Sequence, residues 1–264
     1  MILDSIFFYP VKSMSANAAA HIDVGSRGPQ WDRRWMVIDS DNRFLTGRVV
    51  PRLVRFCAEV DQGTLRLSVD GDHLTVSDDF ETVREVVVWK DVLEVADCGD
   101  QVAEWLSRHL GRDVRLVFQR DQDRRWLPEG KRVFEADEVS FADGYPLLLI
   151  GTASLDALNR SLQRPVAMDR FRPNLVVKTK TPYVEDSWRD IVIGQTPFTV
   201  ASQCTRCVFT TIDPDTGERD SNGEPLATLL RTRRRQSDLK PVFGVNLVPN
   251  SEGRVYEGDA VTVG

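Results

Sequence analysis

The chain has 264 residues, of which 41% are hydrophobic and 28% are charged, and its formal net charge is −6. This ordinary composition argues against a disordered chain, and the acidic balance argues against a general nucleic-acid binder. The four cysteines are unevenly spaced, which argues against a disulfide framework.

No stretch of 18 apolar residues is present, and the N-terminus has no charged region followed by a long apolar run. We therefore expect no membrane span, no signal peptide and a cytoplasmic location. The length allows one large domain or two modest ones, each with an ample core.

The first predicted strand, residues 2–9, ends at a proline and leads into a polar loop that holds Lys12 and Ser13. A lysine and a hydroxyl just after a strand suit a phosphate, because a point charge and a donor converge on one oxyanion. Lys-Ser pairs are common, so an ordinary solvated loop is the alternative. The next strand, residues 35–39, begins after Arg33 and Arg34, which are either ligand-binding or solvated charges.

Short alternating segments at residues 54–60, 64–69 and 85–88 are separated by glycine-containing turns. This pattern predicts a β-meander in a barrel or sandwich. Residues 100–110 have the helical apolar spacing, and a strand follows at residues 112–118. A long polar loop then begins, and we place a domain boundary after residue 118.

A buried strand at residues 147–150 leads into Thr152 and Ser154, which precede a helix predicted over residues 155–162. Hydroxyls at a helix N-terminus suit an oxyanion, because free backbone N–H groups point outward there. Capping of the helix without any ligand explains the same two residues equally well.

Residues 168–174 contain two arginines, a rigid proline and an amide, including Arg172 and Asn174. This set suits recognition of an anionic ring that is rich in hydrogen-bonding groups. A later run, residues 231–235, holds four arginines. That run is either a solvated face or a patch for phosphate or a partner.

Two cysteines, Cys204 and Cys207, flank a Thr-Arg pair, and the β-branched run at residues 208–212 predicts a strand that begins after Cys207. Arg206 should favour the thiolate of Cys207. A redox dithiol, a structural zinc site, two ordinary core cysteines and one thiolate bound to the metal of a cofactor are the alternatives. A dithiol normally opens a helix and zinc needs two further ligands, so both fit poorly.

Three segments together resemble one family. They are Cys-Thr-Arg-Cys followed by Thr-Thr-Ile-Asp-Pro-Asp-Thr-Gly at residues 204–217, Arg-Phe-Arg-Pro-Asn at 170–174, and Tyr-Pro-Val-Lys-Ser at 9–13. The chain resembles the molybdenum cofactor sulfurase C-terminal (MOSC) domain family, in the branch of the mitochondrial amidoxime-reducing component and its bacterial relatives. Some of those relatives carry a C-terminal ferredoxin domain, and no matching cysteine cluster occurs here.

The resemblance implies a mainly β fold with a few helices (α+β), with an N-terminal MOSC-type β-barrel domain over residues 1–118 and a MOSC β-barrel domain over residues 119–264. It implies that the molybdenum cofactor (molybdopterin) is held, with Cys207 as the molybdenum ligand and catalytic residue. The expected cofactor-binding residues are Lys12, Ser13, Arg33, Thr152, Ser154, Arg172 and Asn174, with Arg48 and Arg170 as weaker candidates.

The implied activity is reduction of N-hydroxylated compounds such as amidoximes, hydroxylamines and N-hydroxylated bases. A separate ferredoxin-like or flavoprotein donor would supply electrons and dock on positive charge at Arg124, Arg125 and residues 231–235. The resemblance also leaves open a carrier of the cofactor or of sulfur that uses a cysteine persulfide. No protein base is evident, so protons come from water, or from Asp213 or Asp215, which also read as turn formers.

Overall fold

The computed structural model describes residues 1–77, 80 and 82–264. Among these residues the fold is mainly β with three α-helices, α1 (Asp100–Leu110), α2 (Thr152–Asn159) and α3 (Leu226–Thr232). The strands are β1 (Ile2–Phe8), β2 (Asn17–Ala19), β3 (His21–Gly25), β4 (Gly28–Pro29), β5 (Trp35–Asp39), β6 (Cys57–Asp61), β7 (Thr64–Val69), β8 (Asp72–Thr75), β9 (Val83–Val88), β10 (Asp91–Asp97), β11 (Val114–Phe118), β12 (Leu147–Gly151), β13 (Leu175–Lys178), β14 (Asp190–Ile193), β15 (Thr196–Thr205), β16 (Val242–Pro249), β17 (Gly253–Tyr256) and β18 (Val261–Val263). The described residues also form five short 3₁₀ helices, η1 (Pro51–Arg55), η2 (Glu129–Lys131), η3 (Met168–Phe171), η4 (Val184–Ser187) and η5 (Val208–Thr211).

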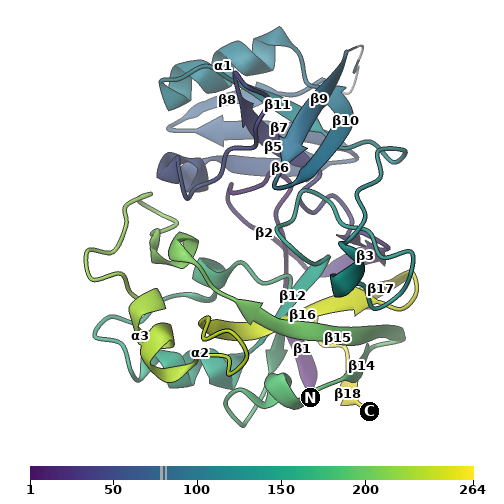
Figure 1. Ribbon diagram of the computed structural model, residues 1–264, viewed down its shortest axis with the longest axis vertical. Helices are drawn as coiled ribbons and strands as arrows, with labels where there is room; N and C mark the ends of the chain where they lie inside the picture. Colours follow the sequence, from purple (N-terminus) through teal and green to yellow (C-terminus); the bar gives the residue numbers. More distant parts are fainter. Residues whose placement is uncertain (78–79, 81) are drawn as a thin grey trace.

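An eight-stranded sheet forms the lower lobe in Figure 1, in the order β18-β14-β15-β16-β12-β13-β1-β2. The first strand of the chain, β1, lies between β13 and β2, so residues from both ends of the sequence share this sheet. Only β12 and β13 pair in parallel within the described part of this sheet, and α2 connects them. Every residue of β12 is buried, as expected for a central strand covered on both faces.

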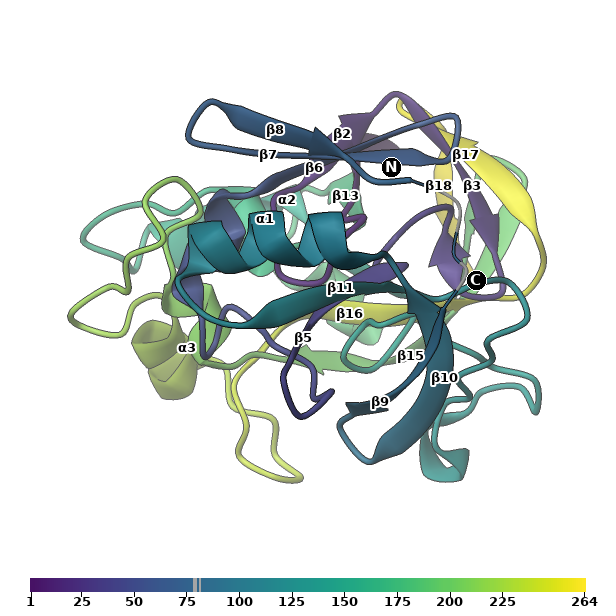
Figure 2. The same ribbon diagram turned by 90° about the horizontal axis from the view of Figure 1, so that it is seen from above.

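The upper lobe contains a four-stranded sheet, β5-β11-β10-β9, and a three-stranded sheet, β6-β7-β8. Helix α1 has the bounds predicted from its apolar spacing and packs across β11 (Figure 2). Its buried face, which includes Trp105 and Leu106, joins Phe56 and Trp35 in the core of this lobe. A further sheet, β17-β3-β4, connects N-terminal and C-terminal residues.

The prediction of a mainly β chain with a few helices is confirmed. Closed barrels stay a prediction: no ladder joins the end strands β18 and β2 within residues 1–77, 80 and 82–264, although an isolated bridge joins Ile2 of β1 to Ala260, the residue before β18. The boundary after residue 118 also stays a prediction. The topology adds that β1 to β4, all before that boundary, pair with one another or with strands of the lower lobe. In the part of the chain that the structure describes, no helix is long and apolar enough to cross a membrane.

Candidate functional site

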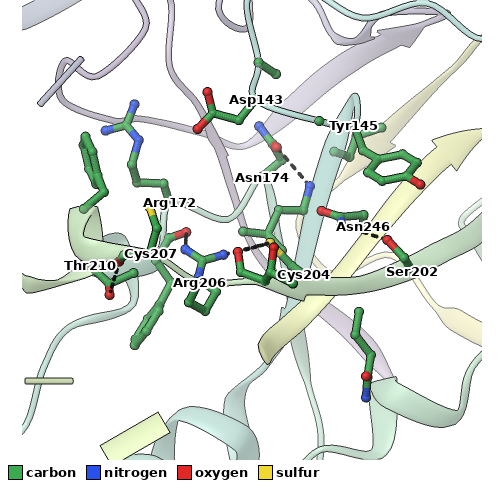
Figure 3. Close-up of a pocket in the computed structure, with 18 of the residues that line it drawn as sticks. Asp143, Tyr145, Arg172, Asn174, Ser202, Cys204, Arg206, Cys207, Thr210 and Asn246 are labelled. Atoms are coloured by element: carbon green, nitrogen blue, oxygen red, sulfur yellow. Dashed lines mark hydrogen bonds between the residues drawn. The ribbon is translucent and has the colours of Figure 1, made fainter. Parts of the chain in front are cut away.

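A cavity of about 470 Å³ lies beside the C-terminal end of β15 and receives residues from both lobes. Figure 3 shows Asp143, Arg172 and Asn174 above the ribbon that carries Cys204 and Cys207. Asp143 is the one carboxylate among the described residues that line the cavity. Eight cationic side chains line it as well: Lys12, Arg33, Arg48, Lys131, Arg172, Arg206, Arg235 and Lys240. An acidic chain thus concentrates positive charge at one hollow, which favours an anionic ligand.

Lys12 lies at the inner wall and is almost fully buried, with 4% of its surface exposed. Its Nζ donates to the carbonyl of Phe141 at 2.6 Å and to Oδ1 of Asp143 at 2.5 Å. Burial lowers the pKa of Lys12 to about 8, although Asp143 acts in the opposite direction. Burial alone would raise the pKa of Asp143, but the charges of Lys12 and Arg48 hold it well below its usual range.

Three predicted cofactor-binding residues have backbones in the left-handed region: Ser13 at φ 73°, Arg33 at φ 50° and Arg172 at φ 57°. This conformation is uncommon for residues other than glycine and has an energetic cost. Residues held in such conformations cluster at ligand sites, where the surrounding structure fixes them. Their occurrence on one cavity supports a binding role for this wall.

The side chains of Arg33 and Arg172 stack on the ring of Tyr9, with guanidinium carbons 4.3 Å and 4.0 Å from the ring centroid. Arg172 Nη1 donates to the carbonyl of Met14 at 2.6 Å, whereas its Nη2 has no partner among the described residues. Desolvation and the nearby charge of Arg33 lower the pKa of Arg172 to about 10. A buried donor without a partner calls for a physical explanation, and a hydrogen-bond acceptor on a ligand bound beside Arg172 would provide one.

Asn174 lines the same cavity, but its amide is already engaged. Its Nδ2 donates to Asp32 at 3.0 Å and to the carbonyl of Phe7 at 3.2 Å, while its Oδ1 accepts from Arg33 and from the amide of Leu148. The structure therefore places Asn174 where it fixes Arg33 and joins β1 to β12. Its contact with a cofactor stays a prediction.

The prediction of a strand after Cys207 is wrong. Strand β15 ends at Thr205, and Cys207 is the extended residue that precedes η5. The hydroxyl of Thr210 donates to the carbonyl of Cys207 at 2.9 Å, and that of Thr211 to the carbonyl of Val208 at 2.8 Å. These local bonds offset the strand preference of the β-branched run. The thiol of Cys207 is exposed at the cavity.

The assignment of Arg206 to Cys207 is also wrong. Arg206 Nη1 donates to the sulfur of Cys204 at 3.0 Å, and the cation at Cys207 is Arg48, whose Nε lies 3.3 Å from its Sγ. Arg48 also forms an ion pair with Asp143 and stacks on Trp89, with its guanidinium carbon 5.1 Å from the ring centroid. The sequence pattern did not predict the contact between Arg48 and Cys207. It gave no indication of Asp143.

Thr152 and Ser154 lie away from this cavity, in the first turn of α2. The site where we expected an oxyanion already holds the carboxylate of Glu185, which is fully buried. Its Oε1 accepts from Ser154 Oγ at 2.6 Å and from the amide of Gly151 at 3.1 Å. Of the two interpretations, the geometry favours a structural role at this helix N-terminus.

We expect Glu185→Ala to lower the free energy of unfolding by about 2–4 kcal/mol, because it leaves buried donors of Gly151 and Ser154 unpaired. Urea unfolding measures this loss, and Glu185→Gln, which retains an acceptor, is expected to lose less than half as much. The amount of the expected molybdenum cofactor per folded molecule should stay normal in both variants. Unchanged stability in Glu185→Ala would contradict the structural role of this carboxylate.

The arginines expected at a docking face are largely neutralised. Arg125 is buried and bonded to Asp91, Ser140 and Ala142, and Arg124 pairs with Glu138. In the run at residues 231–235, three of the four arginines form ion pairs with Glu224, Asp186 and Asp238. Of these arginines, only Arg235 lines the cavity in the described part of the chain, so the expected docking arginines contribute little of its positive charge.

No group of three or more histidine, cysteine, aspartate or glutamate side chains is placed to hold a metal ion in the described residues. Within the same residues the four cysteines are free thiols. This arrangement leaves no protein site for zinc or for an iron–sulfur cluster in the described part. A thiol that acts as the single protein ligand of a cofactor's metal is compatible with it.

Two known domain families match the chain. The model of the MOSC N-terminal beta barrel domain matches residues 1–113, and the model of the MOSC domain matches residues 136–262. The chain belongs to the MOSC family. The cavity lies across both matched regions of this MOSC chain, since Lys12, Arg33 and Arg48 come from the first and Arg172 and Cys207 from the second.

The MOSC chain is similar over nearly its whole length to curated relatives. It is 33% identical to mitochondrial amidoxime-reducing component 1 of Mus musculus, over 97% of this chain and 80% of the relative. It is 32% identical to the same component of Danio rerio, over 98% and 84%, and 31% identical to mitochondrial amidoxime reducing component 2 of Rattus norvegicus, over 98% and 82%. The resemblance noted in the sequence is thereby confirmed.

Proposed function

We propose that this MOSC chain is a molybdenum cofactor-dependent reductase of N-hydroxylated compounds. The observation that carries the proposal is the exposed thiol of Cys207 at a cavity whose walls are rich in cations. The names of the relatives, which are amidoxime-reducing components, support the same reaction class.

The residues present fit the cofactor. A molybdopterin carries a phosphate and a ring with many hydrogen-bonding groups, and the inner wall offers the ammonium of Lys12, the hydroxyl of Ser13 and the unpaired Nη2 of Arg172. Cys207 would supply a soft thiolate ligand, which suits molybdenum. Arg33 and Asn174 would hold this wall in shape through their bonds to Asp32.

When bound, the cofactor supplies oxygen-atom abstraction and two-electron redox chemistry at its metal. Each turnover breaks one N–O bond, consumes two electrons and two protons, and releases the amine or amidine and water. Arg48 holds the sulfur of Cys207 in place through its Nε. Asp213 is engaged by Arg170 and by the amides of Asp215 and Thr216, so it serves as a turn former and water is the proton source we propose.

The experiment that tests the function is elemental analysis of protein made in a cofactor-competent host, followed by turnover of benzamidoxime with reduced viologen. We expect one molybdenum per chain and steady formation of benzamidine. A separate electron-donor protein supplies the electrons in our proposal, so NADH alone should support no turnover. Absence of molybdenum, or steady turnover with NADH and no carrier, contradicts it.

A carrier of the cofactor or of sulfur is the second candidate. The observation that favours it is that two thiols line one cavity and each accepts a bond from a different arginine. A persulfide on Cys207 would serve such a carrier. A sulfur carrier should contain no molybdenum and should show sulfane sulfur on Cys207 by mass spectrometry, which separates it from the reductase.

Retention of the cofactor should depend on pH through Lys12. Its pKa of about 8 means that the ammonium, which attracts a phosphate, is lost as the pH rises through that value. Asp143 faces the ammonium and opposes this loss, whereas Arg48 and Arg125 promote it. We expect molybdenum content after dialysis to be high near pH 7 and to fall towards about pH 9.

Lys12→Arg is the matched control for this prediction, because arginine keeps its charge throughout the range. The decline in molybdenum between the two pH values should be smaller in this variant than in the native protein. An equal decline in both proteins would show that another group controls retention.

A further inference from the structure

The cations of the cavity form two groups. The inner group contains Lys12, Arg33, Arg48 and Arg172, and the carboxylates of Asp143 and Asp32 are bonded to three of them. Four positive charges against two negative ones leave two in excess. A phosphate monoester carries a charge of about −1.5 to −2, so a single phosphate is enough to balance the inner group.

The outer group is formed by Arg206, Lys131, Arg235 and Lys240. Lys131 lies at the end of η2, and Arg235 and Lys240 lie on a loop closed by a bond from the amide of Arg235 to the carbonyl of Lys240 at 2.9 Å. These side chains line the same cavity as Cys207, although their segments are far apart in the sequence.

The positive charges of the outer group are offset by little negative charge. Asp238 pairs with Arg235 at 2.6 Å and with Lys240 at 3.5 Å, and it is the only carboxylate that forms an ion pair with this group in the described residues. Arg206 uses its Nη atoms on the sulfur of Cys204 and the carbonyl of Phe171. Lys131 forms no ion pair with any described residue. Three positive charges therefore remain after a cofactor phosphate has been balanced by the inner group.

Neutral polar side chains line the same cavity as the outer cations. Asn246 Nδ2 donates to Ser202 Oγ at 3.1 Å, and Tyr145 lines the same region (Figure 3). These groups can bind a polar ring by hydrogen bonds while the cations bind an acidic group attached to it. We propose that the outer cations form a second anion subsite, which selects N-hydroxylated substrates that carry a phosphate or carboxylate group. This inference rests on the proposed reductase function.

Paired substrates test the subsite. N4-hydroxycytidine is compared with its 5′-monophosphate, and benzamidoxime with 4-carboxybenzamidoxime, all with reduced viologen so that no carrier protein takes part. We expect kcat/KM to be about tenfold higher for the charged member of a pair, as one charge-assisted hydrogen bond would give. An advantage in one pair only identifies the phosphate or the carboxylate as the recognised group.

The double variant Lys131→Gln/Lys240→Gln should reduce this ratio to near one and leave kcat/KM for the neutral substrates unchanged. Lys180→Gln is the matched control, because Lys180 is exposed and does not line the cavity. Equal kcat/KM for charged and neutral substrates in the native protein would overturn the proposal. An effect of the double variant that appears only with a protein donor would overturn it as well, and would assign these lysines to docking of the donor.

A binding measurement separates failure of this inference from failure of the function. Cytidine 5′-monophosphate and cytidine, the products expected from the first pair, are titrated into the protein by calorimetry. The monophosphate should bind about tenfold more tightly, and the double variant should abolish the difference. If no N-hydroxylated compound is reduced, the proposed function fails, while this comparison still decides whether the subsite exists.

Discussion

Replacing Cys207 with alanine is expected to abolish reduction of benzamidoxime and to remove molybdenum from the purified protein. Cys207 is the exposed thiol beside the inner cations, and alanine offers no ligand for a metal. The measurements are molybdenum per chain and the initial rate with reduced viologen. Full activity in Cys207→Ala would end the assignment of this residue as the ligand.

Cys204→Ala is the matched control, since it removes the same atom from a neighbouring position. Its thiol is bonded to Arg206 and packs partly against the apolar cluster of Phe171 and Phe243. We expect this variant to retain a substantial part of the activity and its molybdenum. Equal losses in the two variants would instead indicate a dithiol mechanism.

Replacing Arg172 with alanine is expected to lower cofactor occupancy by roughly tenfold or more. Its unpaired Nη2 and its position on the inner wall suit a charge-assisted bond, and such bonds contribute about 1.5–3 kcal/mol. Arg172→Lys should also lose occupancy, because lysine lacks the planar fork that stacks on Tyr9. Molybdenum per chain measures both effects.

Arg170→Ala is the control from the same segment. Arg170 pairs with Asp213 at 2.9 Å and does not line the cavity, so its loss should leave molybdenum content near normal. Normal content in both Arg172 variants, or an equal loss in Arg170→Ala, would rule out the specific role of Arg172.

The sequence predicts most elements of the fold where periodicity is strong. Helix α1 has the bounds that its apolar spacing predicts, and β1 ends one residue before the expected position. The strand expected after Cys207 fails because threonine hydroxyls bond to local carbonyls, an effect that β propensity does not include. Pairing of β1 with β13 was not predicted, since propensity carries no information about partners far away in the sequence.

The residues of the candidate site also divide into those that the sequence predicts and those that only the structure identifies. Four separate segments of the sequence are brought to one cavity, and they contribute Lys12 with Ser13, Arg33, Arg172 with Asn174, and Cys207. The local pattern at Thr152 and Ser154 left an oxyanion site and helix capping open, because it cannot show that Glu185, some 30 residues later, fills the helix N-terminus. Arg48 and Asp143 become significant only through their contacts in space, with Cys207 and with Lys12.

The position of β1 within the eight-stranded sheet has a consequence for synthesis of the chain. β1 is made long before its partner β13, which begins at Leu175, so the strand has to wait for most of the intervening residues before that pairing forms. Pairings between such distant segments are slow to form, because a long loop must close first. On the ribosome, the apolar side chains of Leu3 and Ile6 would remain without their final neighbours during this interval. The same delay applies to Lys12 and Ser13, so the inner wall of the cavity can be completed only late in folding.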